Sequence, residues 1–172
     1  MRYSGGVRCF IALGSNLGDR EAWLRMALDR LRETPGSWAI AVSRLFETAA
    51  VGPPQGPYLN AAAGLETALS PQALLARLLA IEREAGRARG PERNAPRTLD
   101  LDLLLYGDVC LEEPDLVLPH PRLAERGFVL APLAEIAGPV RHPKLGVTIA
   151  ELAARVRDPS AVRAWKPVRP WP

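Results

Sequence analysis

Apolar positions recur along this chain with two different spacings, which predicts a mixture of strands and helices. Residues 7–13 (VRCFIAL) form a short run rich in strand formers. Apolar residues then recur at helical spacing from Ala22, after the capping residue Asp19, until Pro35 ends the pattern. Residues 38–46 alternate roughly between apolar and polar side chains, which indicates a second strand.

A second strand–helix–strand group follows the first. A loop rich in Pro and Gly at 48–57 precedes a predicted strand at 58–69. A helix is expected from Ser70-Pro71, because proline is favoured at the first helical position, and Gly86 ends it. A strand at 98–106 completes the order β-α-β-β-α-β. We therefore expect an α+β protein with a ferredoxin-like core, in which helices pack on one face of an antiparallel sheet.

The C-terminal part is expected to add to this core. Helices are predicted near 130–136 and 148–156, and the proline-rich tail at 158–172 is expected to lie across the surface. No repeat or linker divides the chain, and 172 residues suit one domain. We therefore interpret residues 1–172 as a single domain with its core at about 7–136.

Composition and charge exclude several classes of protein. Hydrophobic residues make up 48% and charged residues 24%, as in a soluble chain, and no apolar run approaches the roughly 18 residues of a membrane span. Basic residues outnumber acidic ones by 22 to 19, and a net charge of +3 is too small to identify a nucleic-acid binder. Cys9 and Cys110 cannot form a disulfide framework, and the first residues carry no secretory pattern. We expect a cytoplasmic protein.

Two carboxylates in the last predicted strand carry the most informative chemistry. Asp100 and Asp102 are two residues apart, so on a strand their side chains point to the same side. Adjacent carboxylates repel each other unless a cation lies between them, and Mg²⁺ is usually held by one or two carboxylates together with substrate phosphates. The alternative is a solvated acidic face on an edge strand. The opposite, buried face is expected to be made by Leu99, Leu101, Leu103 and Leu105.

An arginine-rich loop comes directly before these carboxylates. Arginine binds phosphate oxygens with a planar fork of donors. A carboxylate pair behind such a loop is the arrangement expected of a nucleotide-phosphate and magnesium site. The alternative is a solvated basic loop that pairs with Glu84 and Glu92. The arginines of the loop are Arg87, Arg89, Arg93 and Arg97.

Four further residues have the chemistry of a binding site. His120 lies between two prolines, which fix the backbone and favour a positioned side chain. Tyr58 and Asn60 are two residues apart on a predicted strand, hence on one side. Together with Phe128 they offer aromatic faces and amide hydrogen bonds to a flat heterocycle. The alternatives are a structural histidine and ordinary residues of a sheet face.

Taken together, six segments resemble the 6-hydroxymethyl-7,8-dihydropterin pyrophosphokinase family of folate biosynthesis. They keep the family's order and nearly its spacing, and the resemblance covers roughly residues 7–136. The combination of PRTLDLD with PHP and RGF is its most specific part. The segments are ALGSNLG at 12–18, YLNAA at 58–62, GRAR at 86–89, PRTLDLD at 96–102, LPHP at 118–121 and RGF at 126–128.

The resemblance implies transfer of the β,γ-pyrophosphate of ATP to the hydroxymethyl group of the pterin, with release of AMP. It implies two magnesium ions on Asp100 and Asp102, and it makes Arg87 and Arg97 the catalytic arginines that engage the phosphates. It further implies ATP-side contacts from Arg89, Arg93, Leu103, His120 and Arg126. The pterin pocket would be made by Thr48, Val51, Tyr58, Asn60 and Phe128, the last stacking on the ring.

The implied partners are these two small molecules, and we expect a monomer that uses neither nucleic acid nor a membrane. Two rival functions fit less well. An RNA-binding ferredoxin-like module would need aromatic residues on its middle strands, whereas Asp100 and Asp102 would repel phosphate. A nucleotide-sugar transferase with a DxD motif would use the same metal chemistry, but it normally needs a larger, doubly wound domain.

The chain departs from the family pattern at four places, one of which is the loop at 48–58, about one residue shorter than in some members. Residues 93–96 (RNAP) stand where many members carry Trp and Gly before the proline, so an aromatic residue that would cover the pterin is missing. Asp115 and Val117 stand where some relatives place Arg and Thr near the nucleotide. The proline-rich tail has no clear counterpart.

Overall fold

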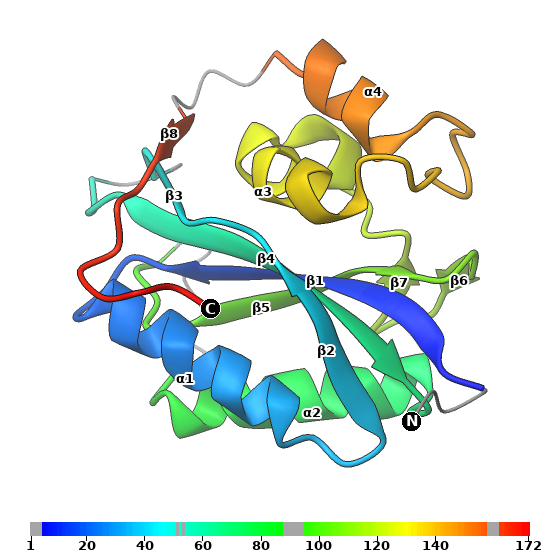
Figure 1. Cartoon of the computed structure of the whole chain (residues 1–172), viewed down its shortest axis with the longest axis horizontal. Helices are drawn as coiled ribbons and strands as arrows, with labels where there is room; N and C mark the ends of the chain where they lie inside the picture. The colour runs from blue at the N-terminus through cyan, green and yellow to red at the C-terminus, as the bar shows by residue number, and fades with distance from the viewer. Residues whose placement is uncertain (1–4, 51, 53, 88–94, 158–161) are drawn as a thin grey trace.

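An antiparallel sheet of six strands forms the middle layer of the molecule (Figure 1). The computed structural model describes residues 5–50, 52, 54–87, 95–157 and 162–172, apart from the side chain of Ile40. The strands lie in the order β5-β1-β4-β3-β8, and β2 pairs with the other end of β4. They are β1 (Val7–Ser15), β2 (Ser37–Val42), β3 (Phe46–Thr48), β4 (Tyr58–Thr67), β5 (Asp100–Tyr106) and β8 (Val162–Ala164).

Helices cover both faces of this sheet (Figure 1). α1 (Arg20–Arg32) and α2 (Pro71–Glu84) pack on one face, and α3 (Gly127–Ala137) and α4 (Ile149–Arg155) pack on the other. The ferredoxin-like core predicted from the sequence is confirmed, with its two helices on one face, and the C-terminal additions cover the second face. No helix in the described ranges has the length and apolar character needed to cross a membrane.

Alternating side chains on the strands build a hydrophobic core on each face. In β1, Cys9, Ile11 and Leu13 pack against α1 and α2, whereas Phe10 packs with α3 and α4. Because successive strand residues point to opposite faces, a strand buried on both sides must be almost continuously apolar. The uninterrupted apolar run at 9–13 therefore reflects the position of β1 between two helical layers.

The last core strand departs from the expected alternation. Leu101 and Leu103 pack in the core beside α2, as expected. The register between β1 and β5 then shifts after Phe10, so that Leu104 is an extra residue without a partner in β1. Leu104 and Leu105 both pack in the core beneath α3. The expectation that Leu105 shares a face with Leu101 is therefore wrong, because a β-bulge reverses the facing of the residues beyond it.

Residues 38–46, expected as one strand, form parts of two. β2 ends at Val42 and β3 begins at Phe46, and both pair with β4. Between them Ser43 donates its backbone N–H to the oxygen of Ala62 at 2.9 Å, and its hydroxyl accepts the N–H of Ala62 at 2.8 Å. A side-chain hydroxyl thus replaces one rung of the ladder, which ends the regular pairing at this point.

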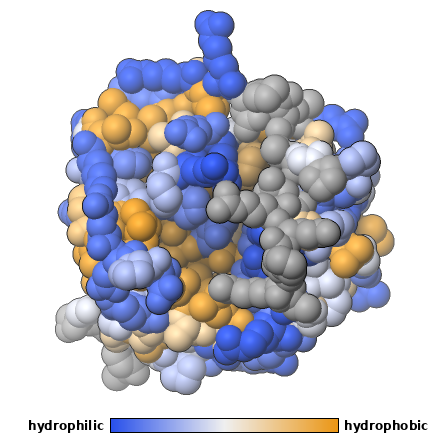
Figure 2. Space-filling view, turned by 180° about the vertical axis from the view of Figure 1, so that it is seen from behind, coloured by the Kyte–Doolittle hydropathy of each residue, from blue (hydrophilic) through white to orange (hydrophobic). Residues whose placement is uncertain are grey.

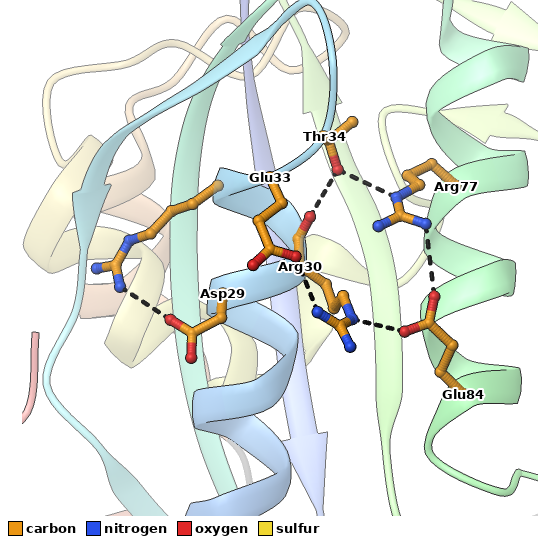
Figure 3. A network of polar contacts seen from close by, with 7 residues as sticks. Asp29, Arg30, Glu33, Thr34, Arg77 and Glu84 are labelled. Carbon is orange, nitrogen blue, oxygen red and sulfur yellow. Dashed lines mark hydrogen bonds and ion pairs between the residues drawn. The ribbon is translucent and has the colours of Figure 1, made fainter.

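Polar contacts join α1 to α2 at the surface (Figure 3). Arg30 Nε lies 2.6 Å from Glu84 Oε2, and Arg77 Nε donates to Thr34 Oγ1 at 3.1 Å. Such exposed pairs stabilise a fold only weakly. Their significance here is that Glu84 is engaged between the two helices. Within the described ranges Glu84 therefore pairs with Arg30 and Arg77, whereas Arg89, Glu92 and Arg93 of the basic loop lie outside those ranges.

Shorter elements complete the chain. A hairpin of β6 (Leu111–Glu112) and β7 (Val117–Leu118) and a 3-10 turn at Leu123–Glu125 connect β5 to α3. After α4 the tail returns to the sheet, where β8 pairs with β3, and it then passes over the beginning of α1 (Figure 1). This last strand was not predicted from the sequence.

Candidate active site

Three adjacent strands present small or polar residues on the face that α3 covers. Asp100 of β5 lies opposite Gly14 of β1, and Gly14 lies opposite Asn60 of β4. Asp102 lies opposite Ala12. A Cβ atom added to Gly14 would meet Asn60 Oδ1 at 3.4 Å and the Tyr58 ring at 3.5 Å, so glycine keeps this part of the sheet open. The spacing of these residues along their strands thus gathers them on one face.

Two arginines hold Asp100. Arg87 Nη1 donates to Asp100 Oδ1 at 2.8 Å, and Arg97 Nη1 donates to Asp100 Oδ2 at 3.0 Å. Arg87 follows α2 and Arg97 precedes β5, so the two ends of the basic loop converge on one carboxylate. The three side chains are only 15–28% exposed, which strengthens hydrogen bonds between charged groups.

Glu82 also contacts Arg87, and the sequence analysis did not identify it as a site residue. It is buried on the inner side of α2, where it accepts a hydrogen bond from Arg87 Nη1. It also accepts the backbone N–H of Leu101 at 2.8 Å. One signal was available, because Glu82 follows Leu74 and Leu78 at intervals of four and so lies on the apolar face of the helix. A carboxylate on such a face needs a partner.

Asp102 lies beside Asp100 in a different environment. None of the hydrogen bonds and ion pairs of the described ranges involves its side chain. Burial, followed by the negative charge of Asp100, raises the pKa of Asp102 to about 7, although the Arg126 guanidinium acts in the opposite direction. A cation between the carboxylates would relieve this penalty, so the pair fits Mg²⁺, which accepts carboxylate oxygens and completes its shell with phosphates and water.

The two carboxylates lie between two cavities, and both residues line both. The larger cavity, of about 340 Å³, opens at the edge of β5 between α2 and the segment that follows β6. The smaller, of about 30 Å³, lies on the face of the sheet beneath the beginning of α3. The back of the molecule shows hydrophilic and hydrophobic residues mixed around a hollow (Figure 2).

The larger cavity combines an apolar wall with cationic and hydrogen-bonding groups. Its wall includes Leu75, Leu79 and Leu103, and its polar side includes Arg87, Arg97 and His120. Asp115 and Val117, which depart from the family pattern, also line it. A cavity of this composition can take a molecule with a flat apolar part and an anionic part.

His120 faces this cavity as a neutral ring. Burial, and then the nearby charge of Arg126, lowers the pKa of His120 to about 4. Its Nδ1 accepts the backbone N–H of Arg122 at 3.2 Å, which assigns the ring proton to Nε2. At neutral pH this side chain therefore supplies a hydrogen-bond donor without a positive charge.

The smaller cavity lies among residues that suit an aromatic heterocycle. Its lining includes Asn60 and Phe128, and Asn60 Nδ2 donates to Thr48 Oγ1 at 2.9 Å. Tyr58 lies opposite Thr48 in the β3–β4 pair. The Arg126 guanidinium lies 5.5 Å from the centre of the Phe128 ring, so it stacks on the aromatic group.

Asn16 links Arg97 to the segment that precedes β4, and it was not singled out in the sequence. Its Nδ2 donates to Gln55 Oε1 at 2.7 Å and to the oxygen of Gly56 at 3.2 Å. Its Oδ1 accepts the backbone N–H of Arg97 at 2.7 Å, and its own backbone N–H donates to the backbone oxygen of Arg97 at 3.0 Å.

Three of the predicted site residues lie outside the described residues, namely Val51, Arg89 and Arg93.

Comparisons with known proteins agree on one family. Residues 10–138 match the model of the family described as 7,8-dihydro-6-hydroxymethylpterin-pyrophosphokinase. The chain is 43% identical over 158 residues to 2-amino-4-hydroxy-6-hydroxymethyldihydropteridine pyrophosphokinase of Bacillus subtilis, over 91% of this chain and 89% of that protein. The protein of the same name from Synechocystis is 44% identical over 160 residues, 93% of this chain and 80% of that protein.

The fold is also similar to that of a solved structure. The crystal structure of Plasmodium falciparum HPPK-DHPS A437G with pteroate superposes with a TM-score of 0.68 at 15% identity, over 89% of this chain. The chain spans less than half of that protein, 44% of its length, and at this identity the similarity concerns the fold alone. The family model covers well over half of the sequence, and the chain belongs to the 7,8-dihydro-6-hydroxymethylpterin-pyrophosphokinase family.

Proposed function

We propose that Asp100 and Asp102 mark the point where the two bound substrates meet. The chain catalyses the reaction of its family, transfer of a pyrophosphoryl group from ATP to the hydroxymethyl group of 6-hydroxymethyl-7,8-dihydropterin in folate biosynthesis, which gives the pterin diphosphate and AMP. The observation that carries the proposal is that both carboxylates line both cavities. ATP would occupy the larger cavity and the pterin the smaller.

The composition of the larger cavity supports its assignment to ATP. The adenine ring would lie against the apolar wall that includes Leu79 and Leu103, and the phosphates would point toward Arg87, Arg97 and His120. The neutral His120 ring would donate from Nε2 to a phosphate oxygen. Arg126, which lies close enough to influence both Asp102 and His120, would add a positive charge on the same side.

In the absence of phosphate the two arginines neutralise Asp100. Phosphate oxygens of ATP would compete for the same guanidinium groups and free the carboxylate. Glu82 would keep Arg87 near the site during this exchange, because it holds the same Nη1 from the other side. The released charge on Asp100 and the buried charge on Asp102 would then be available for two magnesium ions. When bound, Mg²⁺ would neutralise phosphate oxygens and lower the pKa of the attacking hydroxyl.

The residues around the smaller cavity support its assignment to the pterin. Phe128 would stack on the ring, and Asn60, oriented by Thr48, would hydrogen-bond its edge. Tyr58 lies across from Thr48 and would complete this side. A volume of about 30 Å³ holds little more than water, so side chains around the cavity must move when the bicyclic ring enters. No side-chain nucleophile is required, because the substrate hydroxyl attacks the β-phosphorus directly.

The proposal also covers domain organisation, localisation, oligomeric state and partners. We propose a single domain at 1–172 that acts as a cytoplasmic monomer on two small molecules, without nucleic acid or a membrane. The support is a near balance of 22 basic and 19 acidic residues and two free thiols, Cys9 and Cys110, which are typical of reducing compartments. Light scattering after size-exclusion chromatography tests the oligomeric state, and a dimer mass would refute the monomer.

Two measurements test the reaction and the placement of its substrates. AMP release from ATP should require both magnesium and the reduced pterin, and release without the pterin would contradict the reaction. Phe128→Ala should raise the pterin KM by about 5- to 10-fold and leave the ATP KM near normal, because stacking contributes about 0.5–1.5 kcal/mol beyond burial. Leu79→Ala should do the reverse. Equal effects on both substrates in either variant would refute the assignment of one cavity to each.

A further inference from the structure

Arg20 makes contacts that the reaction does not explain. It is the first residue of α1, where the helix dipole disfavours a positive charge. Its Nη1 nevertheless lies 2.9 Å from Glu47 Oε2 and donates to the backbone oxygen of Pro57 at 2.9 Å. One guanidinium therefore links β3 to the residue that precedes β4.

The two linked residues stand next to the pterin side of the site. Glu47 precedes Thr48 and Pro57 precedes Tyr58, and Thr48 and Tyr58 are partners in the β3–β4 pair. Asn60, the next residue on the same face of β4, donates its hydrogen bond to Thr48. A change in the separation of Glu47 and Pro57 would therefore shift Thr48 relative to Asn60. Arg20 is in a position to set that separation.

The C-terminal tail braces Arg20. The Arg20 guanidinium lies 5.0 Å from the centre of the Trp165 ring. Trp165 is anchored through its backbone N–H, which donates to the backbone oxygen of Leu45 at 2.9 Å. Arg163 of β8 donates to Glu47 Oε1 at 2.8 Å, so Glu47 is held by an arginine on each of its two oxygens. Stacking on an indole favours a planar guanidinium over an ammonium group. The tail thus restricts the orientation of Arg20.

We propose that Arg20, braced by Trp165, is a positioning residue for the pterin. It holds the adjacent ends of β3 and β4 in the arrangement that lets Thr48 orient Asn60. This inference rests on the proposed placement of the pterin in the smaller cavity. It assigns a role in substrate binding to a tail that lies outside the segments shared with the family pattern.

The same helix provides a matched control. Arg25 stacks on Trp171 of the tail at 5.2 Å, pairs with Glu21 at 2.6 Å and donates to the backbone oxygen of Pro170 at 2.9 Å. It therefore makes the same three kinds of contact as Arg20. None of its contacts in the described ranges reaches β3 or the residue before β4. Arg25→Ala loosens the tail without removing the link between the strands.

The test measures KM for both substrates and kcat in the full-length Arg20→Ala, Arg20→Lys and Arg25→Ala variants, with melting temperatures alongside. Arg20→Ala should raise the pterin KM by about 5- to 10-fold, with kcat and the ATP KM within about twofold of wild type. Arg20→Lys, which keeps the charge but not the planar fork, should give an intermediate pterin KM. Arg25→Ala should leave the pterin KM near normal, whatever its melting temperature.

Several results would overturn the inference. A normal pterin KM in Arg20→Ala would do so, as would an equal rise in Arg25→Ala or a parallel rise in the ATP KM. If Arg20→Ala fails to fold, a wild-type pterin KM in Arg20→Lys decides against the inference. Asn60→Ala separates the inference from its premise. If Asn60→Ala leaves the pterin KM unchanged, the placement of the pterin is wrong; if it raises that KM while Arg20→Ala does not, only the role of Arg20 is wrong.

Discussion

Asp100→Asn and Asp102→Asn should both reduce pyrophosphoryl transfer, but they should change the stability of the metal-free protein in opposite directions. Asp100→Asn removes the negative charge that pairs with Arg87 and Arg97. Because all three side chains are partly exposed and Arg87 keeps Glu82, we expect a modest loss of about 1–2 kcal/mol in the free energy of unfolding.

Asp102→Asn should stabilise the metal-free protein at neutral and alkaline pH. Burial and the charge of Asp100 raise the pKa of Asp102 from 3.8 to about 7, so the folded state disfavours the ionised carboxylate. Ionisation therefore destabilises the fold progressively as pH rises from the unfolded to the folded pKa, and fully above it. Each pKa unit corresponds to about 1.4 kcal/mol, so asparagine should gain about 2–4 kcal/mol over aspartate at pH 8, and much less near pH 4.

Urea unfolding in EDTA at pH 5, 6, 7 and 8 measures these differences, and pyrophosphoryl transfer across a magnesium titration measures the activity. For a chain of this size each kcal/mol shifts the melting temperature by about 2–4 °C, so the two variants should separate clearly on either side of wild type. Both should lose about 100- to 1000-fold in turnover. Stability changes of the same sign, or wild-type turnover in either variant at low magnesium, would refute the reasoning.

Two other predictions concern the arginines and the thiols. Arg87→Ala and Arg97→Ala should each reduce kcat by about 30- to 1000-fold and weaken ATP binding less, because each arginine contacts the phosphates fully only during their transfer. Unchanged kcat in both variants would refute their assigned role. Burial raises the pKa of Cys9 to about 12, so only the exposed Cys110 should react with a disulfide reagent at pH 8 in the native protein, and both should react in urea. Two fast thiols in the native protein would contradict the buried position of Cys9.

Local periodicity accounts for the features that could be predicted. The runs that became β1, α1, α2 and β5 each carry their own signal within about ten residues, because strand and helix periods repeat over a short stretch of chain. The shared face of Asp100 and Asp102 follows from the same period of two, which a bulge two residues later does not disturb. The order of these elements then limits the sheet to few topologies.

The resemblance to the family pointed to specific site residues, which local periodicity does not identify. Arg87, Arg97 and His120 were selected because they lie in segments whose order matches the family, and the structure brings all three to the cavity that Asp100 and Asp102 also line. The convergence of His120 with the two arginines is not visible in the spacing, because β5 and the hairpin of β6 and β7 lie between them in the chain.

By itself the sequence determined where β1, α1, α2 and β5 lie and that Asp100 and Asp102 share a face, since both depend on neighbours a few residues away. Only the tertiary structure decided that Glu82 is buried beneath Arg87, that Leu105 turns to the second core, and that Arg20 links β3 to the residue before β4. Each of these depends on contacts between residues distant in the chain. Such contacts are stabilised by packing and by hydrogen bonds to buried polar groups, and the local periodicity of the sequence does not reveal them.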